Sequence, residues 1–393
     1  MNVGVVKETC RGENRVALVP SVVPKLKKAG LEVLVEAGAG MAAGFQDEEY
    51  TDRGARVVAS REEVFSQSEI VAQVRSLGSN PDSGMADVEN LRPEQCLIGS
   101  MEPLSPSDAT KAGAAKGAIL FALELVPRIT RAQSMDVLSS MATIAGYKAV
   151  LLAANALNRM FPMMMTAAGT ITPAKVLVLG AGVAGLQAIA SAKRNGAVVH
   201  GYDIRPAVKE QVESLGAKFV ELEISSGDAQ DAGGYAKEMG EDFLKKQREL
   251  LTETAAMCNV IITTAAIPGK KAPILVPTAM VDAMMPGTVI VDLAAERGGN
   301  CELTKCGETV IHNGVIILGP ENLPSTVPYH ASEMYARNVV TFIMNMVKEG
   351  ALNLDMEDEI IAGSLVAKGG EILHDRVRDV FGLPKSSVEG EDQ

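Results

Sequence analysis

Short runs of aliphatic and β-branched residues alternate with longer amphipathic stretches along this chain, in two successive series. Such alternation is typical of α/β proteins, in which right-handed helical crossovers join parallel strands. The first series predicts strands at residues 2–6, 32–37, 56–58, 69–74, 96–100 and 118–122, and the second predicts strands at 176–179, 198–203, 218–222, 260–264 and 288–293. We therefore expect two lobes, each built on a parallel sheet.

Three helices are predicted, and the two longer ones set the expected domain boundaries. One lies in PSVVPKLKKAG, with Pro20 near its start and Gly30 as its stop. An Ala/Leu-rich helix over 134–160 joins the two series, and a helix over 332–349 follows the second. Because the chain can then return to its first lobe, we predict an N-terminal lobe over 1–136, a lobe over 137–328 inserted in it, and a C-terminal return over 329–393.

One long stretch, SSGDAQDAGGYAKEMG at 225–240, has neither helical nor strand periodicity. It predicts a long loop, either a lid over a site or an insertion without function.

Composition and charge narrow the function classes. At ~150 residues per domain, 393 residues predict two or three domains. The formal net charge of −12 gives no attraction for phosphate backbones or anionic lipid. The chain has 8 Phe, 6 Tyr and no Trp, so base-stacking platforms are not expected. These features argue against nucleic-acid binding.

Lys148 and Arg159 interrupt the apolar run 142–165, so we expect no membrane-spanning helix.

The cysteines indicate a reducing compartment. They are odd in number and scattered, at Cys10, Cys96, Cys258, Cys301 and Cys306, which disfavours a disulfide framework. Charged residues near the N-terminus interrupt any signal-peptide core, so we expect a soluble intracellular protein. A metal site at Cys301 and Cys306 with His312 is disfavoured because no second ligand pair follows.

The strongest motif is KVLVLGAGVAGLQAIASAKRNGAVVHGYDIRP. Gly180, Gly182 and Gly185 form G-x-G-x-x-G between a predicted strand and an Ala-rich helix, the arrangement that binds a dinucleotide pyrophosphate at a helix N-terminus. Asp203 follows at the end of the next strand, where a carboxylate can bind ribose hydroxyls and repel a 2′-phosphate. The motif predicts a Rossmann-like lobe that prefers NAD(H), although Arg205 could accommodate a 2′-phosphate.

A second informative stretch is LELVPRITRAQSMDVLSS, at the start of the connecting helix. One interpretation is a helix N-terminus capped by Ser134, with Asp136 favoured by the helix dipole. That interpretation leaves Arg128 and Gln133 unexplained, so we favour a polar site facing the cleft between the lobes.

The four histidines offer no obvious general base. We expect His200 and His374 to be structural, His312 to lie at a turn, and His330 to lie nearest the cleft.

With these segments in view, the whole chain resembles the NAD(H)-binding domain I, or alpha subunit, of proton-translocating NAD(P) transhydrogenase. The resemblance rests on GVVKE, GENRVALVP, PRITRAQSMD, VLVLGAGVAGLQAIA, GYDIRP, AGGYAKEMG, TTAAIPGKKAP and VIVDLAAERGGNCE. Alanine dehydrogenase shares the fold and many of these segments.

The resemblance implies roles for individual residues. Arg128 and Asp136 match residues that fix the nicotinamide carboxamide, and Gln133 matches a glutamine that reaches toward the partner's NADP(H). Ser139 matches a residue of the same nicotinamide-binding loop. Four further positions of that loop are implied to bind the cofactor: Ile129, Thr130, Ser134 and Met135. Further cofactor-binding positions are Gly180, Gly182, Val183 and Gly185 at the pyrophosphate, Asp203, Ile204 and Arg205 at the ribose, Gly234 and Tyr235 in a loop that closes over the nucleotide, Gln247 at its far side, and Ala266 where the family often has leucine.

Alanine dehydrogenase differs from this chain at its catalytic positions. Arg15 matches its carboxylate-binding arginine, but its lysine is replaced by Gln73 or Arg75 and its histidine by Met101 or Glu102. Its aspartate corresponds to Glu296. Amino-acid dehydrogenation is therefore disfavoured.

The resemblance implies direct hydride transfer between NADH and NADP⁺ held by a partner subunit, coupled to proton movement through a membrane subunit. Such a transfer moves no substrate proton, so it requires no general acid or base. The resemblance also implies a homodimer, located in the cytoplasm on the inner face of the cytoplasmic membrane. The alternatives are an alanine-dehydrogenase-like enzyme and a non-catalytic NAD(H) sensor.

Overall fold

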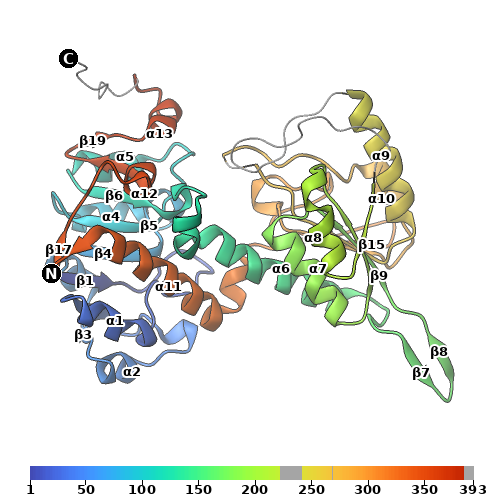
Figure 1. The fold of residues 1–393 in the computed structure, drawn as a ribbon, viewed down its shortest axis with the longest axis horizontal. Coiled ribbons are helices and arrows are strands. Elements are labelled where there is room, and N and C mark those ends of the chain that lie inside the picture. The colour runs from blue at the N-terminus through green and yellow to red at the C-terminus, as the bar shows by residue number, and fades with distance from the viewer. Residues whose placement is uncertain (222–240, 268, 385–393) are drawn as a thin grey trace. The chain divides into compact units, whose positions relative to one another are not determined.

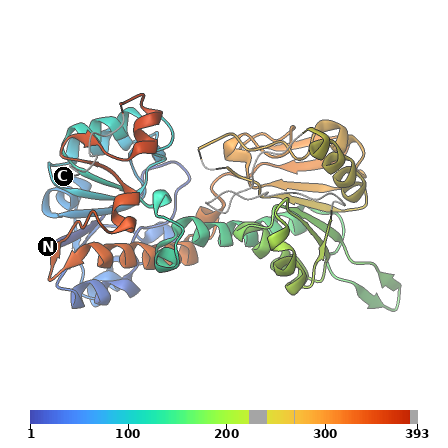
Figure 2. The same ribbon diagram turned by 45° about the horizontal axis from the view of Figure 1, so that its top comes forward.

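A computed structural model describes residues 1–221, 241–267 and 269–384. The chain forms two compact units (Figures 1 and 2). Unit 1 comprises Met1–Met141 and Ser325–Gln393, and unit 2 comprises Ala142–Pro324. The functional domains 1–136, 137–328 and 329–393 stay a prediction. The expected loop at 225–240, with Gly234 and Tyr235, lies outside the described residues.

Unit 1 is built on an eight-stranded sheet in the order β19-β18-β6-β5-β4-β1-β2-β3. Strands β1 to β6 are parallel, as the hydrophobic pattern predicted, whereas β18 pairs antiparallel with β6 and β19 with β18. The pattern did not predict these two short strands of the C-terminal return. The strands are β1 (Asn2–Val5), β2 (Glu32–Glu36), β3 (Arg56–Val58), β4 (Ile70–Arg75), β5 (Cys96–Ser100), β6 (Ile119–Ala122), β18 (Leu365–Lys368) and β19 (Glu371–Ile372).

Helices cover both faces of this sheet because alternate strand residues bury their side chains on opposite sides. Val3 and Val5 of β1 pack with Tyr335 and Phe342 of α11, whereas Val71 of β4 packs with the other helix layer. The first layer contains α1 (Val23–Lys28), α2 (Asp47–Asp52) and α11 (Pro328–Met346); the second contains α3 (Arg61–Gln67), α4 (Gly84–Asn90), α5 (Asp108–Ala115) and α13 (Asp375–Val380).

The remaining elements of unit 1 are short. They are the 3₁₀ turns η1 (Pro20–Val22), η2 (Met41–Ala43), η3 (Leu77–Ser79), η4 (Leu123–Leu125) and η5 (Thr130–Met135), the strands β16 (Val347–Lys348) and β17 (Ala351–Leu352), and α12 (Glu359–Ser364). The predicted helix at 332–349 instead begins at Pro328, because proline at the first helical position has the φ angle that a helix requires.

Unit 2 is built on a seven-stranded sheet in the order β11-β10-β9-β12-β13-β15-β14. All neighbours are parallel except the hairpin β14–β15. The strands are β9 (Lys175–Leu179), β10 (Val198–Tyr202), β11 (Lys218–Phe219), β12 (Val260–Thr263), β13 (Val289–Asp292), β14 (Thr309–His312) and β15 (Val315–Leu318). The helices and turns are α7 (Val183–Arg194), α8 (Lys209–Ser214), α9 (Glu241–Ala256), α10 (Thr278–Asp282), η6 (Pro206–Val208) and η7 (Ala295–Arg297), and η8 (Leu323–Thr326) leads back to unit 1.

A two-stranded hairpin, β7 (Met164–Thr166) with β8 (Gly169–Ile171), projects from unit 2 (Figures 1 and 2). Every residue of both strands is exposed, including Met165 at 78%. Neighbouring Met160 and Met163 are also exposed. The hydrophobic pattern did not predict this hairpin.

Helix α6 (Val137–Ala156) joins the two units. It is shorter than the predicted helix over 134–160. Its 20 residues contain a single charged side chain, Lys148, so within the described part of the chain it is long and apolar enough to cross a membrane by length and composition. About a third of its apolar window is buried inside the protein, including Ala149, Val150 and Ala153 in the core of unit 2.

Candidate nucleotide site

The glycine motif of unit 2 forms a tight turn between β9 and α7. Gly180 has φ +100°, and a Cβ there would lie 2.5 Å from Oγ1 of Thr264. A Cβ on Gly185 would lie 1.8 Å from the carbonyl oxygen of Gly180, so this position requires glycine for close packing. In contrast, a Cβ on Gly182 would meet nothing within 4 Å. Open space at the N-terminus of a 12-residue helix fits a pyrophosphate.

Asp203 lies directly after β10, next to this turn. Its Oδ2 accepts a hydrogen bond from the backbone N–H of Ala181 at 2.8 Å, and its two oxygens pair with the Arg205 guanidinium at 2.9 Å. The hydrogen bond and charge of Asp203 raise the pKa of Arg205 despite its partial burial. The predicted ribose site is thus an Asp203–Arg205 pair, and a ribose hydroxyl would share the carboxylate with the arginine. Val183 begins α7 and is exposed, and Ile204 packs at the edge of the core.

Two other predicted contacts of unit 2 differ in exposure. Gln247 is buried and donates a hydrogen bond to the Tyr202 hydroxyl at 2.9 Å, so its amide is engaged inside the unit. Ala266 is exposed on the segment after β12.

Asn300, which the sequence motifs did not single out, holds that segment. Its Nδ2 donates to the carbonyl oxygens of Ala265 at 2.9 Å and Pro273 at 2.8 Å, and its Oδ1 accepts from the Ala265 N–H at 3.0 Å. The side chain is completely buried. The only sequence signal was a polar residue in GGNC after a hydrophobic strand.

In unit 1, the predicted polar loop forms η5 and leads into α6. Arg128, Thr130, Gln133 and Ser134 are exposed, Ile129 is half-buried and Met135 is buried. Asp136 caps the helix, rather than Ser134 as in the alternative interpretation of this stretch. Its Oδ1 accepts the Ser139 N–H at 2.8 Å and its Oδ2 accepts the Ser139 hydroxyl at 2.6 Å. The helix starts at Val137, so Ser134 lies too far upstream to reach its free N–H groups.

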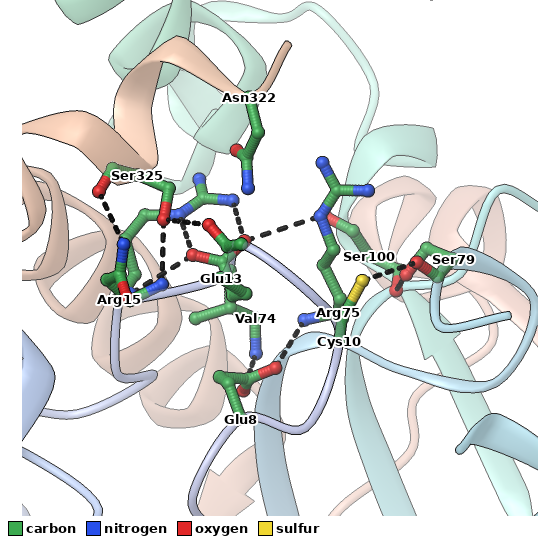
Figure 3. Close-up of polar contacts among 12 residues, drawn as sticks. Glu8, Cys10, Glu13, Arg15, Val74, Arg75, Ser79, Ser100, Asn322 and Ser325 are labelled. Atoms are coloured by element: carbon green, nitrogen blue, oxygen red, sulfur yellow. Dashed lines mark hydrogen bonds and ion pairs between the residues drawn. The ribbon is translucent and has the colours of Figure 1, made fainter. Parts of the chain in front are cut away.

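A buried ionic cluster lies at the carboxyl edge of the unit 1 sheet (Figure 3). Arg15 donates to both carboxylate oxygens of Glu13, at 2.7 and 2.6 Å, and Arg75 donates to the same carboxylate at 3.3 Å. Gln73 instead donates to Asp87 of α4 at 2.8 Å. Arg75, one of the two alternatives for the lysine position, therefore shares the Glu13 carboxylate with Arg15.

Two carboxyl groups at the same edge have raised pKa values. Glu8 accepts the N–H groups of Val74 and Arg75, and burial, together with the charge of Glu13, raises its pKa to about 8. Glu124 accepts the N–H groups of Met101 and Glu102 through Oε1, and burial raises its pKa to about 7. Its buried Oε2 has no hydrogen-bond partner among the described residues.

The other expected positions are dispersed. Met101 is completely buried, whereas Glu102 is exposed with φ +48°. Glu296 of unit 2 is exposed and accepts the Asn322 N–H at 2.7 Å. The four histidines have unrelated surroundings: His200 lies in β10, His312 bonds Asp282, His330 lies against the Tyr329 ring, and His374 precedes α13.

The five cysteines are free thiols. Cys301 is buried and its N–H donates to Asp292, whereas Cys306 is exposed. No group of three or more His, Cys, Asp or Glu side chains within 1–221, 241–267 and 269–384 could hold a metal ion.

Comparison with known proteins gives one consistent family. Residues 4–145 and 149–375 match the models for the N-terminal and C-terminal domains of alanine dehydrogenase/PNT. The chain is 45% identical over 377 residues to the first portion of the NAD(P) transhydrogenase subunit alpha of Rhodospirillum rubrum, covering 95% of this chain and 98% of that protein.

Solved structures agree in fold. A transhydrogenase from Sinorhizobium meliloti matches with a TM-score of 0.82 and 42% identity, over 95% of this chain and 99% of that one. An L-alanine dehydrogenase matches with a TM-score of 0.81 and 27% identity, over 97% and 99% of the two chains. The chain therefore belongs to the alanine dehydrogenase/PNT family and, within it, to the NAD(P) transhydrogenase alpha subunits, a group of nucleotide-binding oxidoreductases.

Proposed function

We propose that this protein is the NAD(H)-binding subunit of a proton-translocating transhydrogenase, and that hydride passes directly between NADH here and NADP⁺ on a partner subunit. The observation that carries the proposal is the contrast in identity: 45% to a transhydrogenase alpha subunit against 27% to an alanine dehydrogenase structure, each over nearly the whole chain. Bound NADH supplies the hydride, and the protein supplies binding and orientation.

Unit 2 holds the dinucleotide in this proposal. The open face at Gly182 admits the pyrophosphate to the N-terminus of α7, where unpaired N–H groups bind anions. Asp203 binds the ribose hydroxyls and disfavours a 2′-phosphate by charge repulsion. Ala266 lies against the nicotinamide end, on a segment that Asn300 keeps in place.

The loop of unit 1 orients the reacting ring. Arg128 and Asp136 fix the carboxamide, Gln133 reaches toward the partner's nucleotide, and Ser139 holds the carboxylate of Asp136 through two hydrogen bonds. Orientation is the main requirement, since two reacting carbons held about 3–3.5 Å apart need no acid or base between them.

The proposed partners are an NADP(H)-binding subunit and an integral membrane subunit, with this chain docked on the inner face of the cytoplasmic membrane. A homodimer is also proposed. The exposed methionines of the β7–β8 hairpin support it, because an apolar arm of this kind is stabilised when a second chain covers it.

A transfer assay tests the proposal. The protein mixed with an NADP(H)-binding partner domain should reduce an NADP⁺ analogue when NADH is added. No transfer, together with NADH formation from alanine and NAD⁺, would establish an alanine-dehydrogenase-like enzyme. Tight NADH binding with no transfer to any nucleotide or keto acid would indicate a sensor.

A further inference from the structure

The polar loop of unit 1 is held along its length by the C-terminal return. Strand β18 pairs with β6 immediately before the loop, at Leu365 opposite Phe121. Helix α11 packs against η5 itself, and α12 packs against η4. Residues more than 200 positions away in sequence thus contact the segment 123–136 at several points.

The most specific contact is made by Arg131, within η5. Its two terminal nitrogens donate to the two carboxylate oxygens of Asp358, one of them at 3.1 Å. Asn345 of α11 donates to the same carboxylate at 2.8 Å and accepts from Arg131 at 3.3 Å. The hydrogen bond from Arg131 holds the pKa of Asp358 well below its usual range. The three side chains form one closed network.

Asp358 also caps a helix, and this second role decides which substitution can test its contact with the loop. It is the N-cap of α12, and its Oδ1 accepts the Ile360 N–H at 2.9 Å. Asparagine caps a helix as well as aspartate does, but it cannot accept two guanidinium hydrogen bonds as a charged carboxylate. Replacement by asparagine therefore separates the contact to the loop from the helix cap.

A second contact is buried. Asn338 of α11, 7% exposed, donates to the carbonyl oxygen of Ser134 at 2.9 Å. Near the loop's start, a Cβ on Gly363 of α12 would lie 3.4 Å from Pro127, so helix and loop are in close contact there as well.

We propose that Asp358, Asn345 and Asn338 are positioning residues, which hold the loop of Arg128 and Gln133 in the conformation that hydride transfer requires. This inference rests on the proposed function. The Arg131 side chain is 52% exposed, so the ion pair adds little to the free energy of unfolding. Its effect is geometric, because a bidentate pair fixes the direction of the arginine and with it the backbone of η5.

The test uses three variants: Asp358→Asn, Arg131→Ala, and the double variant that combines these two substitutions. The control is Glu357→Gln, which makes the same charge change as Asp358→Asn at an exposed neighbouring residue. Hydride transfer should fall about tenfold in each of the first three, since small displacements of reacting groups are costly. The dissociation constant of NADH should change less than about threefold, because the proposed pyrophosphate and ribose contacts lie in unit 2. The double variant should be no slower than the single ones. Glu357→Gln should behave as the wild type.

Hydrogen exchange gives a readout that does not depend on activity. Amides of residues 130–135 should exchange faster in Asp358→Asn and Arg131→Ala than in the wild type, while those of α12 keep their protection in Asp358→Asn. Unchanged exchange in this loop, or wild-type transfer by both variants, would overturn the inference. If the wild type itself transfers no hydride, the proposed function fails, and the exchange measurement still decides whether the return holds the loop.

Discussion

Asn300 shows how one buried side chain shapes the candidate site. Its three hydrogen bonds fix the segment that carries Ala266. Asn300→Ala leaves buried backbone groups without partners, and we expect it to lower the free energy of unfolding by about 2–3 kcal/mol in urea titrations. Exposed Asn155→Ala should stay within about 0.5 kcal/mol. Equal effects of the two substitutions would contradict the role of Asn300.

Asp203 and Arg205 are the residues that we propose set the nucleotide preference. In Asp203→Asn the acceptor for the Ala181 N–H remains, but the charge that repels a 2′-phosphate is lost. We expect the ratio of NADPH to NADH affinity, measured by titration calorimetry, to rise about tenfold. Asp282→Asn, at an exposed hairpin contact, is the control. An unchanged ratio would remove Asp203 from the ribose site.

The carboxyl groups of Glu8 and Glu124 make the stability of unit 1 depend on pH. Both pKa values are raised in the folded protein, to about 8 and about 7, so the folded state binds more protons than the unfolded one near neutrality. This stabilisation is complete below about pH 4.5 and is lost as the pH rises through 7 and 8. The free energy of unfolding should therefore decrease from about pH 5 to about pH 9. Glu8→Gln should flatten that decrease, whereas exposed Glu32→Gln should leave it unchanged.

At the scale of the element, the start of α6 combines a helix cap with a proposed cofactor contact. Asp136→Ala should destabilise the protein by about 1 kcal/mol in thermal unfolding, because the Ser139 N–H loses its acceptor. Asp136→Ser should restore most of this stability, since serine is an equally good cap. Both variants should bind NADH more weakly, because neither has the carboxylate. Normal binding by Asp136→Ser would assign Asp136 to the helix alone.

At the scale of the whole molecule, a substitution in the β7–β8 hairpin tests the proposed dimer. Met165→Glu places a charge on the most exposed apolar residue of the arm and should give a monomer in sedimentation equilibrium. Met85→Glu changes an exposed methionine of α4 and should leave the dimer intact. A dimeric Met165→Glu protein would show that the arm does not form the interface.

Hydrophobic periodicity predicted β1 to β6 and β9 to β13 because it reports which residues are buried on each face. It missed β14 and β15 of unit 2 and β18 and β19 of unit 1. The sequence also placed Gly180, Gly182, Gly185 and Asp203 together, because the motif is local and one strand–turn–helix unit contains it. Asp136 as the cap, Asn300 and the Arg131–Asp358 pair were not predictable in this way.

The sequence by itself determined the two α/β units, the dinucleotide turn and the resemblance to transhydrogenase alpha subunits. These features depend on short-range patterns, in which each residue's neighbours along the chain define its environment. Only the tertiary structure decided which partners the polar side chains take. Arg131 and Asp358 are 227 positions apart, and Asn338 reaches Ser134 over 204, so no local pattern encodes these contacts. Hydrogen bonds depend on distances of a few tenths of an ångström, which the packing of the whole unit sets.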